Sequence, residues 1–497
     1  MRRRLRRLGP GLNWRLVVPV VSGTVLAVGL GMLACFAVAL VNGDGAALAF
    51  GVPGAVAVAT AALGLRTTNR LGAIPLRPRD GFFAVTCAWA TAALVGAIPF
   101  LIYPTFTGIT DAFFESMSGF TTTGATLIDT IEDEPDAILL WRSLSQWLGG
   151  VGIIVLVVAV APATGLASQR VFYAETSGVT AERLTPRIAD TAKIIWGIYL
   201  ALTTLGFVAF LVAGMASFDA INHSFTTVAT GGFSTRTASI AAFDSLAVEL
   251  VAIVFMALGG VNFAFYWRAL RGRERLWPQA AEVRAYVLLL LAGIAVVTTS
   301  LWVSGEAGGL PGALRDATFT VTSIMTTTGY TTADFDEWPS FAPLVLLALM
   351  FVGGCAGSTS GGMKVIRIML LAKTARQEVE RQLRPKAVQV LRVRGKVFSE
   401  ELRRGVLGFF YIYVTVFLVG TLIMAAIGLD LVTAASAVIA TLNVIGPGLG
   451  EVGAIENYGA VPAGGRWVLS FLMLAGRLEI FTVLVLLTPA FWRPNMA

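Results

Sequence analysis

Histidine, cysteine and charge are scarce in this chain, and each scarcity excludes a class of function. The 497 residues contain one histidine, His223, and three cysteines, Cys35, Cys87 and Cys355, which have no paired spacing. A histidine-based metal site, Ser-His catalysis, a disulfide framework and a zinc site are therefore not indicated. Only 13% of the residues are Asp, Glu, Lys or Arg, about half of the roughly 25% that is usual in soluble domains. The low charge indicates a lipid environment.

Long apolar runs take the place of the missing charge. Hydrophobic residues make up 56% of the chain, and a helix of about 20 apolar residues crosses a hydrocarbon core roughly 30 Å thick. Most of the runs are long enough to cross, so we expect an all-α polytopic membrane protein. The runs cover 16–42, 46–65, 82–103, 144–161, 194–215, 246–267, 285–303, 341–352, 405–427 and 467–490.

The basic residues indicate the orientation of the spans. The start "MRRRLRRLG" precedes a long apolar run without a small-residue cleavage site, which favours a retained anchor over a signal peptide. If the spans alternate, one side holds 31 of the 37 Lys and Arg residues, and the positive-inside rule makes that side, with the N-terminus, cytoplasmic. This side carries the N-terminus and the loops 66–80, 170–193, 268–284 and 364–404.

The opposite side is acidic. It holds four arginines, at positions 142, 236, 315 and 466, and includes the acidic stretch "DTIEDEPD" at 129–136. The usual sorting of charged residues by membrane topology explains the excess of basic residues on the cytoplasmic side. It explains the excess of acidic residues on the opposite side less well. An acidic outer face concentrates cations near the membrane.

A segment of 14 residues recurs four times. Each copy begins with Asp-Ala, or Thr-Ala in the weaker fourth copy, and reaches a glycine 13 positions later. Asp and Thr are good helix N-caps, so Asp111, Asp219, Asp316 and Thr433 are predicted to begin four short helices. The copies are "DAFFESMSGFTTTG" (111–124), "DAINHSFTTVATGG" (219–232), "DATFTVTSIMTTTG" (316–329) and "TAASAVIATLNVIG" (433–446).

Each copy lies between two apolar spans and is too short to cross the membrane itself. The predicted unit is a span, a re-entrant half-helix, an extended Thr/Gly loop and a second span. Non-helical backbone at membrane depth persists only where it lines water or is buried in protein. Carbonyls of such loops can replace the hydration shell of a cation, beside the partly negative C-terminus of a half-helix. Alternatively, the glycines and threonines only permit close helix packing, which would need neither the Asp nor the fixed offset.

The repeats suggest a division of the chain into five parts. Residues 1–80 form an N-terminal cytoplasmic arm and two extra transmembrane helices. Four pore repeats follow at 81–165, 166–270, 271–375 and 376–497.

At these residues the sequence resembles the Trk/Ktr/HKT superfamily of potassium transporters, most closely its TrkH-type subunits, over nearly the whole chain. The two extra N-terminal spans favour this branch over the shorter Ktr type. The motifs that carry the resemblance are "DAFFESMSGFTTTGAT", "QWLGGVGIIVLVVAVAP" (146–162), "ATGGFST" (229–235), "TTTGYTT" (326–332), "GGCAGSTSGGMKVIR" (353–367), "NVIGPGLG" (443–450) and "GRLEIFTVLVLLTP" (476–489).

The resemblance implies a bacterial inner-membrane protein with four pore units around one pathway. It implies K⁺ as the transported ion, no organic cofactor in this chain, a homodimer and a cytoplasmic nucleotide-binding regulatory ring of the TrkA type. No nucleic-acid partner is expected. The basic segment 373–404 is either a solvated topological loop or the surface on which that ring docks.

The resemblance also places the ion-coordinating backbone in four filter segments. Related plant transporters that prefer sodium carry serine at the first filter glycine, whereas all four glycines are present here, which implies potassium selectivity. The fourth segment lacks threonine and is followed by Pro447, so it departs from the fourfold pattern. The filter segments are Thr122, Thr123 and Gly124; Thr230, Gly231 and Gly232; Thr327, Thr328 and Gly329; and Val444, Ile445 and Gly446.

The stretch "GGCAGSTSGGMK" (353–364) interrupts the second span of the third repeat. Glycines and small polar residues fray a helix, and membrane depth tolerates this where the chain faces a pore; the alternative is a glycine-rich packing kink. In the family this loop gates the pore below the filter, beside the arginine that matches Arg477. The predicted gate residues are Gly353, Gly354, Gly357, Ser358, Thr359, Gly361, Gly362, Lys364 and Arg477.

Two neighbours of these motifs receive narrower predictions. Arg477 lies inside an apolar run, where a charge is costly unless it faces water or a partner. Glu479 should point to another helix face, so we do not expect it to be the direct partner of Arg477. Tyr330, just beyond the third filter glycine, should brace its loop without touching the ion.

Channel-like potassium uptake is therefore the function we expect, and a sodium-passing or sodium-coupled cation transporter of the same superfamily is the alternative. An intramembrane enzyme acting on lipid would need convergent ionisable groups at depth, where the repeats place Thr and Gly. The stretch "GPGLGEVG" (446–453) resembles a dinucleotide fingerprint but lacks a βαβ unit around it.

Overall fold

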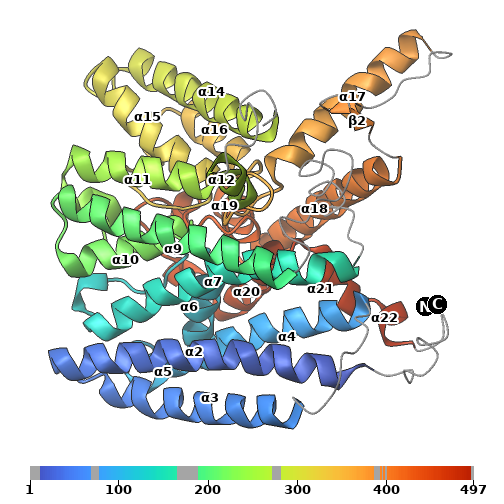
Figure 1. Cartoon of the computed structure of the whole chain (residues 1–497). Coiled ribbons are helices and arrows are strands. Elements are labelled where there is room, and N and C mark those ends of the chain that lie inside the picture. The colour runs from blue at the N-terminus through green and yellow to red at the C-terminus, as the bar shows by residue number, and fades with distance from the viewer. Residues whose placement is uncertain are drawn as a thin grey trace.

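Helices long enough to cross a membrane dominate the computed structural model, which describes residues 12–68, 78–164, 188–270, 281–384, 392–393, 396–397 and 400–493. Within these residues, six helices are long and apolar enough to span, or up to eight if each of two bent helix pairs is one span. Most of them lie roughly side by side (Figure 1). The six are Trp14–Asn42, Ala47–Thr67, Arg79–Ile102, Ala192–Val212, Ala281–Ser304 and Leu402–Ala426.

The first two helices form a pair along one side of the molecule (Figure 1). They are α2 (Trp14–Asn42) and α3 (Ala47–Thr68). Their backbones come close because α2 has a glycine at the crossing: a Cβ on Gly29 would lie 2.9 Å from the Ala57 Cβ. Small residues at such crossings are typical of helix packing in membranes.

The predicted first and second repeats follow the same order of elements. Each begins with a long helix, continues with a short half-helix, and ends with a helix that returns. The first contains α4 (Pro78–Gly96), α5 (Ile98–Ile102), the half-helix α6 (Ile109–Thr121), η1 (Ile131–Asp133) and α7 (Asp136–Thr164). The second contains α9 (Ile188–Val212), the half-helix α10 (Ser217–Val228), η2 (Ser239–Phe243), α11 (Leu246–Gly259) and α12 (Phe263–Leu270).

The predicted third and fourth repeats keep that order. A two-stranded antiparallel hairpin, in which Arg392 pairs with Val397, lies between them. The third contains α14 (Ala281–Ser304), the half-helix α15 (Leu310–Met325), α16 (Phe341–Met350) and α17 (Val365–Leu383). The hairpin consists of β1 (Arg392–Val393) and β2 (Lys396–Val397). The fourth repeat contains α18 (Glu400–Ala426), the half-helix α19 (Leu431–Leu442), η3 (Gly450–Val452), η4 (Tyr458–Ala460), α20 (Ala463–Arg477), α21 (Phe481–Leu484), η5 (Val485–Leu487) and α22 (Pro489–Trp492).

The predicted half-helix caps are wrong. The residues that precede α6, α10 and α15 are Gly108, Ala216 and Gly309, so Asp111 and Asp219 lie in the first turn. Asp316 lies well inside α15, because that helix begins almost two turns earlier at Leu310, with Pro311 in its first turn.

The fourth half-helix has a true side-chain cap one turn before the predicted one. Asp430 precedes α19, and its carboxylate accepts from the backbone N–H groups of Val432 at 2.9 Å and Thr433 at 3.2 Å. Thr433 is thus inside the first turn, where its hydroxyl accepts from the N–H of Glu451 at 3.1 Å.

The return helices of three repeats are broken, which corrects the prediction of continuous spans at 246–267 and 467–490. The axes of α11 and α12 differ by 93°, and those of α20 and the segment Phe481–Leu487 differ by 111°. Glu479 and Ile480 at the second break have left-handed backbones, with φ of 59° and 56°. In the third repeat, α16 ends at Met350 and α17 begins at Val365, so the 353–364 loop separates them as expected.

Candidate functional site

Each half-helix ends directly at a filter segment, with the same backbone geometry in all four. The first residue of each segment has a left-handed backbone: φ is 58° at Thr122, 52° at Thr230, 59° at Thr327 and 53° at Val444. This conformation is rare and strained for a β-branched side chain. Strain that recurs at four matching positions points to a functional constraint on the backbone.

The next residues complete the shared geometry. The N–H of the second residue reaches back five positions, as Thr123 does to the Ser118 carbonyl at 2.8 Å and Ile445 to that of Ala440 at 2.8 Å. This bond closes the C-terminus of the half-helix and leaves the following carbonyls free of the helix. The third residue is a left-handed glycine, with φ of 84° at Gly124, 78° at Gly232, 81° at Gly329 and 105° at Gly446.

The four segments form a closed ring. A Cβ on Gly124 would overlap the Gly231 carbonyl oxygen of the second segment. In the same way Gly232 abuts the Thr328 carbonyl, and Gly329 abuts that of Ile445. The ring closes because a Cβ on Gly446 would lie 2.8 Å from the Thr123 carbonyl oxygen of the first segment. Only glycine allows carbonyls of four distant chain segments to approach this closely.

Two cavities border the ring. All four third-position glycines line the first, the mouth cavity, which has an empty volume of about 520 Å³ and also includes Arg142, Arg236 and Glu456. The second, the loop cavity, has an empty volume of about 750 Å³. It is lined by Gly357, Ser358, Ser360, Gly361, Gly362 and Lys364, and by residues such as Asn262, Asn443 and Arg477.

The 353–364 loop contacts the ring on the side away from the mouth cavity. The Gly361 N–H donates to the hydroxyl of Thr327, the first residue of the third segment, at 2.6 Å. A Cβ on Gly361 would overlap the Asn443 carbonyl oxygen just before the fourth segment. The Thr359 hydroxyl donates to the carbonyl of Val228 at 3.0 Å, at the end of the half-helix α10. The loop therefore lies across the first residues of the filter segments.

Two cations hold the loop. The buried Arg477 guanidinium donates to the Thr359 carbonyl at 2.7 Å and to the Gly149 carbonyl of α7 at 3.1 Å. The Lys364 ammonium donates to the Ser360 carbonyl. As predicted, Glu479 is not the partner of Arg477; it pairs with Arg367 at 2.6 Å.

All four arginines of the predicted outer side form ion pairs beside the half-helices. Arg466 pairs with Asp111, Arg236 with Asp219 at 3.0 Å, and Arg315 with Glu249 at 2.7 Å. The motif residues Asp111 and Asp219 thus hold neighbouring elements in place and do not cap their helices.

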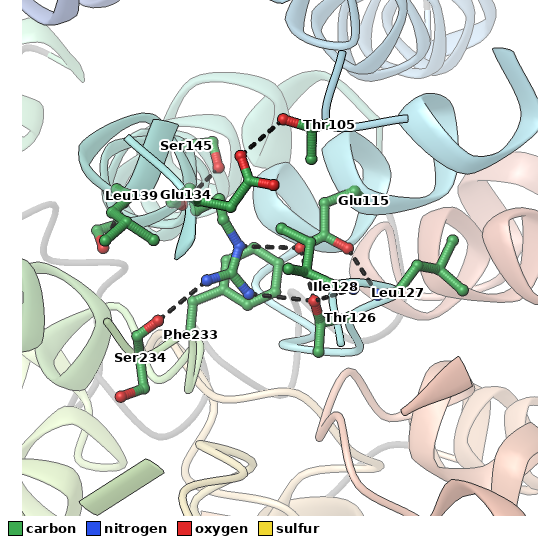
Figure 2. Close-up of polar contacts among 12 residues, drawn as sticks. Thr105, Glu115, Thr126, Leu127, Ile128, Glu134, Leu139, Ser145, Phe233 and Ser234 are labelled. Atoms are coloured by element: carbon green, nitrogen blue, oxygen red, sulfur yellow. Dashed lines mark hydrogen bonds and ion pairs between the residues drawn. The ribbon is translucent and has the colours of Figure 1, made fainter. Parts of the chain in front are cut away.

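The fourth pair is fully buried. Arg142 of α7 and Glu115 of α6 are 1% and 0% exposed, and Arg142 Nε lies 2.9 Å from Glu115 Oε1. The guanidinium also donates to the Ser234 carbonyl at 3.0 Å and to the Thr126 hydroxyl at 3.2 Å. Its Cζ lies 4.2 Å from the centre of the Phe233 ring. Figure 2 shows how Glu115, Thr126, Phe233 and Ser234 surround this point.

This cluster joins the first and second filter segments on their mouth side. Its residues were not among the site residues predicted from the sequence. Thr126 follows the first segment, and Phe233 and Ser234 follow the second. The signal in the sequence was an acid inside a half-helix, which is costly at depth without a partner, and an arginine two residues before the apolar run 144–161. Two tyrosines support the ring in a comparable way: the Tyr330 hydroxyl bonds that of Thr227 at 3.1 Å, and the Tyr458 hydroxyl donates to the Gly446 carbonyl at 2.6 Å. Tyr330 is thus a brace, as predicted.

A ring of strained backbone segments between two cavities, inside a bundle of apolar helices, defines a membrane transport protein for ions. Comparison with known proteins agrees with this class. The sequence model of the TrkH family, described as cation transport protein, matches residues 53–493. The chain belongs to the TrkH family of membrane cation transporters, and it is not an enzyme.

Relatives match over almost their whole length. The chain is 43% identical over 491 residues to the Trk system potassium uptake protein TrkH of Halomonas elongata, covering 97% of this chain and 100% of that one. It is 42% identical over 482 residues to the protein of the same name from Escherichia coli strain K12, covering 96% and 98%. The crystal structure of the potassium transporter TrkH from Vibrio parahaemolyticus matches with a TM-score of 0.88 at 41% identity, covering 97% and 100%. The predicted all-α polytopic membrane fold is confirmed.

Proposed function

We propose that this protein takes up potassium by channel-like permeation through the ring of filter segments. The observation that carries the proposal is the closed order of the ring, in which each third-position glycine abuts the second-position carbonyl of the next segment. Four half-helix C-termini end at this ring and add partial negative charge without a charged side chain. Carbonyls held in this way can replace the hydration shell of a cation.

Potassium is the cation that this proposal favours. The relatives are named for potassium uptake, and all four segments retain the glycine. In the first and third segments the second-position threonine is held from behind by a hydroxyl pair, Thr121 with Thr123 and Thr326 with Thr328, each at 2.8 Å. Such support favours a ring of fixed size, suited to one ion. The alternative is a sodium-passing or sodium-coupled transporter.

The 353–364 loop is the proposed gate. It bonds Thr327 and Val228 at the ring, and Arg477 and Lys364 hold its carbonyls. A glycine-rich loop with small side chains can leave such a position because many backbone conformations are open to it. A positive charge beside it would also oppose the passage of cations while the loop is in place.

Further parts of the proposal concern orientation and partners. We place the mouth cavity outside and the N-terminus in the cytoplasm, as the positive-inside rule favours. The C-terminal half of α17 extends beyond the bundle (Figure 1). This supports a docking role for a nucleotide-binding regulatory ring. Part of the predicted docking surface 373–404, including positions 385–391, lies outside the described residues. The name "Trk system" of the relatives also suits a protein with partners. A homodimer is proposed on the family resemblance alone.

Uptake of rubidium-86 into liposomes that contain the purified protein tests the function. Potassium should compete with this uptake, and sodium at the same concentration should not. Absence of any competed flux, with and without the partner ring, would contradict potassium permeation. Equal competition by sodium would establish the alternative.

A further inference from the structure

The glutamine of the "QWLGG" stretch lies directly behind the second filter segment. Gln146 of α7 is completely buried. Its Nε2 lies 2.6 Å from the Gly231 carbonyl oxygen, and its Oε1 lies 3.0 Å from the Phe233 nitrogen. The orientation of the amide is fixed by chemistry, because a carbonyl can only accept and a backbone N–H can only donate. Gln146 therefore bonds the chain on both sides of Gly232.

This contact explains why the second segment differs from the first and third. A Cβ at position 231 would overlap the Gln146 amide carbon, so the side chain of the glutamine occupies the space where the first and third segments have the side chain of a threonine. The second segment also has Ala229 where the first and third have Thr121 and Thr326, so it has no hydroxyl pair behind it. The amide of Gln146 replaces that missing support.

The bond from Gln146 also changes the distribution of partial charge in the ring. The Gly231 carbonyl is the one that abuts Gly124 in the ring. Among the second-position carbonyls of the described segments, it alone accepts a hydrogen bond from a side chain. A donor on one lone pair draws electron density from the carbonyl and fixes its direction. The four sides of the ring are consequently not equivalent.

We propose that Gln146 is a positioning residue that determines ion specificity by holding the Gly231 carbonyl in its place in the ring. This inference rests on the proposed function. The second segment has two consecutive glycines, Gly231 and Gly232, and without the glutamine it is the side of the ring with the most conformational freedom. A ring with one loose side can contract around a smaller ion, so loss of the amide lowers the preference for potassium over sodium.

The test compares rubidium-86 uptake, and its competition by potassium and sodium, in liposomes with wild-type protein and with Gln146→Leu. Leucine has a similar volume and can make neither bond. We expect the K⁺/Na⁺ preference to fall by roughly fivefold to tenfold, the factor expected from losing one or two net hydrogen bonds, while total cation flux persists. Thr60→Leu is the control, because Thr60 is exposed on α3, outside the predicted pore repeats, and its hydroxyl bonds the Val56 carbonyl of its own helix.

A second comparison decides the matter if Gln146→Leu does not fold. Gly231→Ala puts a methyl group against the Gln146 amide and should lower the preference. The same change should have a smaller effect in a Gln146→Ala background, because the clashing group is then absent; additive effects would overturn the proposal.

The outcomes separate the inference from the function on which it rests. If wild-type protein shows no potassium-competed flux, the proposed function fails. If wild-type protein is selective and Gln146→Leu keeps its preference, only the role of Gln146 is overturned. If Gln146 had a purely structural role, its replacement would lower the flux of both ions alike without changing their ratio. That result would also overturn the proposed role of Gln146 in ion specificity.

Discussion

The Arg477 guanidinium donates to the carbonyl oxygen of Thr359 at 2.7 Å. A charge at the end of α20 in the fourth repeat thereby holds a loop of the third repeat, while its second donor reaches α7 of the first at 3.1 Å. Thr359 itself bonds the carbonyls of Val228 and Gly259 in the second repeat. One loop residue therefore links, directly or through Arg477, elements of all four predicted repeats beside the ring, so we expect a change in this contact to reach the whole proposed pathway.

Replacing Arg477 by alanine should raise cation flux. The substitution removes two charge-assisted hydrogen bonds that hold the loop and removes a positive charge beside the pathway. One such bond contributes about 1.5–3 kcal/mol, so we expect roughly a tenfold or greater rise in rubidium-86 uptake at unchanged K⁺/Na⁺ preference. Arg15→Ala is the control, since Arg15 is exposed on α2, outside the predicted pore repeats. Unchanged flux would remove Arg477 from the gate.

Deleting residues 355–360 should raise flux in the same assay. The deletion removes the Thr359 contacts and shortens the loop, but it leaves Gly361, whose N–H bonds Thr327. Because the filter carbonyls themselves are not altered, we expect the K⁺/Na⁺ preference to stay the same. A deletion that changed selectivity and left the rate alone would show that the loop belongs to the filter and not to a gate.

Serine at a ring glycine should abolish the preference for potassium. A Cβ at position 124 would overlap the Gly231 carbonyl oxygen, and the left-handed φ of 84° adds backbone strain. We expect Gly124→Ser to pass sodium about as well as potassium. Gly408→Ser in α18 is the matched control, because a Cβ there meets nothing within 4 Å. Retained potassium preference in Gly124→Ser would exclude the first segment from the filter.

Most long helices, the half-helices, the glycine-containing segments that follow them and the interrupting loop were predictable because each depends on local sequence: apolar length, a repeated offset and glycine. The caps were not. Asp111 looks like a cap by residue type, yet Arg466, 355 positions away, takes its carboxylate. The breaks after Gly259 and Arg477 were not predicted either, because the sequence around them stays apolar. At the first break, the Gly260 carbonyl accepts from the N–H of Cys355 in the distant loop at 2.8 Å. Contacts between distant segments decide both features.

The cap of the fourth half-helix should make stability depend on pH. Bonds from the Thr433 hydroxyl and from the N–H groups of Thr433 and Val432 lower the pKa of Asp430. A lowered pKa means that the carboxylate stabilises the fold fully above its ordinary pKa of about 3.9 and that this contribution is lost as pH falls through the folded value.

Asp430→Ala should therefore cost about 1 kcal/mol at neutral pH and little at pH values below the folded pKa. Unfolding by SDS titration in mixed micelles measures both. Asp430→Asn retains a cap without the charge, so it should keep most of the stability at neutral pH and lose the pH dependence. An alanine variant with the same deficit at both pH values would contradict a capping carboxylate.

Breaking the buried ion pair should be far more costly than breaking an exposed one. Glu115, whose side chain is 0% exposed, accepts from Arg142, from the Thr126 hydroxyl at 2.9 Å and from the Leu127 N–H at 3.0 Å. Arg142→Met leaves this carboxylate buried without its counter-charge, which typically costs about 3–5 kcal/mol. Arg376→Met, which breaks the exposed pair with Glu380, should cost less than about 1 kcal/mol.

The double variant Arg142→Met with Glu115→Gln distinguishes a charge effect from a packing effect. Glutamine removes the stranded charge; its Oε1 can accept from the Leu127 N–H and its Nε2 can donate to the Thr126 hydroxyl. The double variant should therefore recover much of the stability lost in Arg142→Met. SDS titration of the four proteins gives the coupling between the two positions. If the double variant is no more stable than Arg142→Met, the arginine acts mainly by filling the space against Phe233, where its Cζ lies 4.2 Å from the ring centre, and the ion pair contributes little.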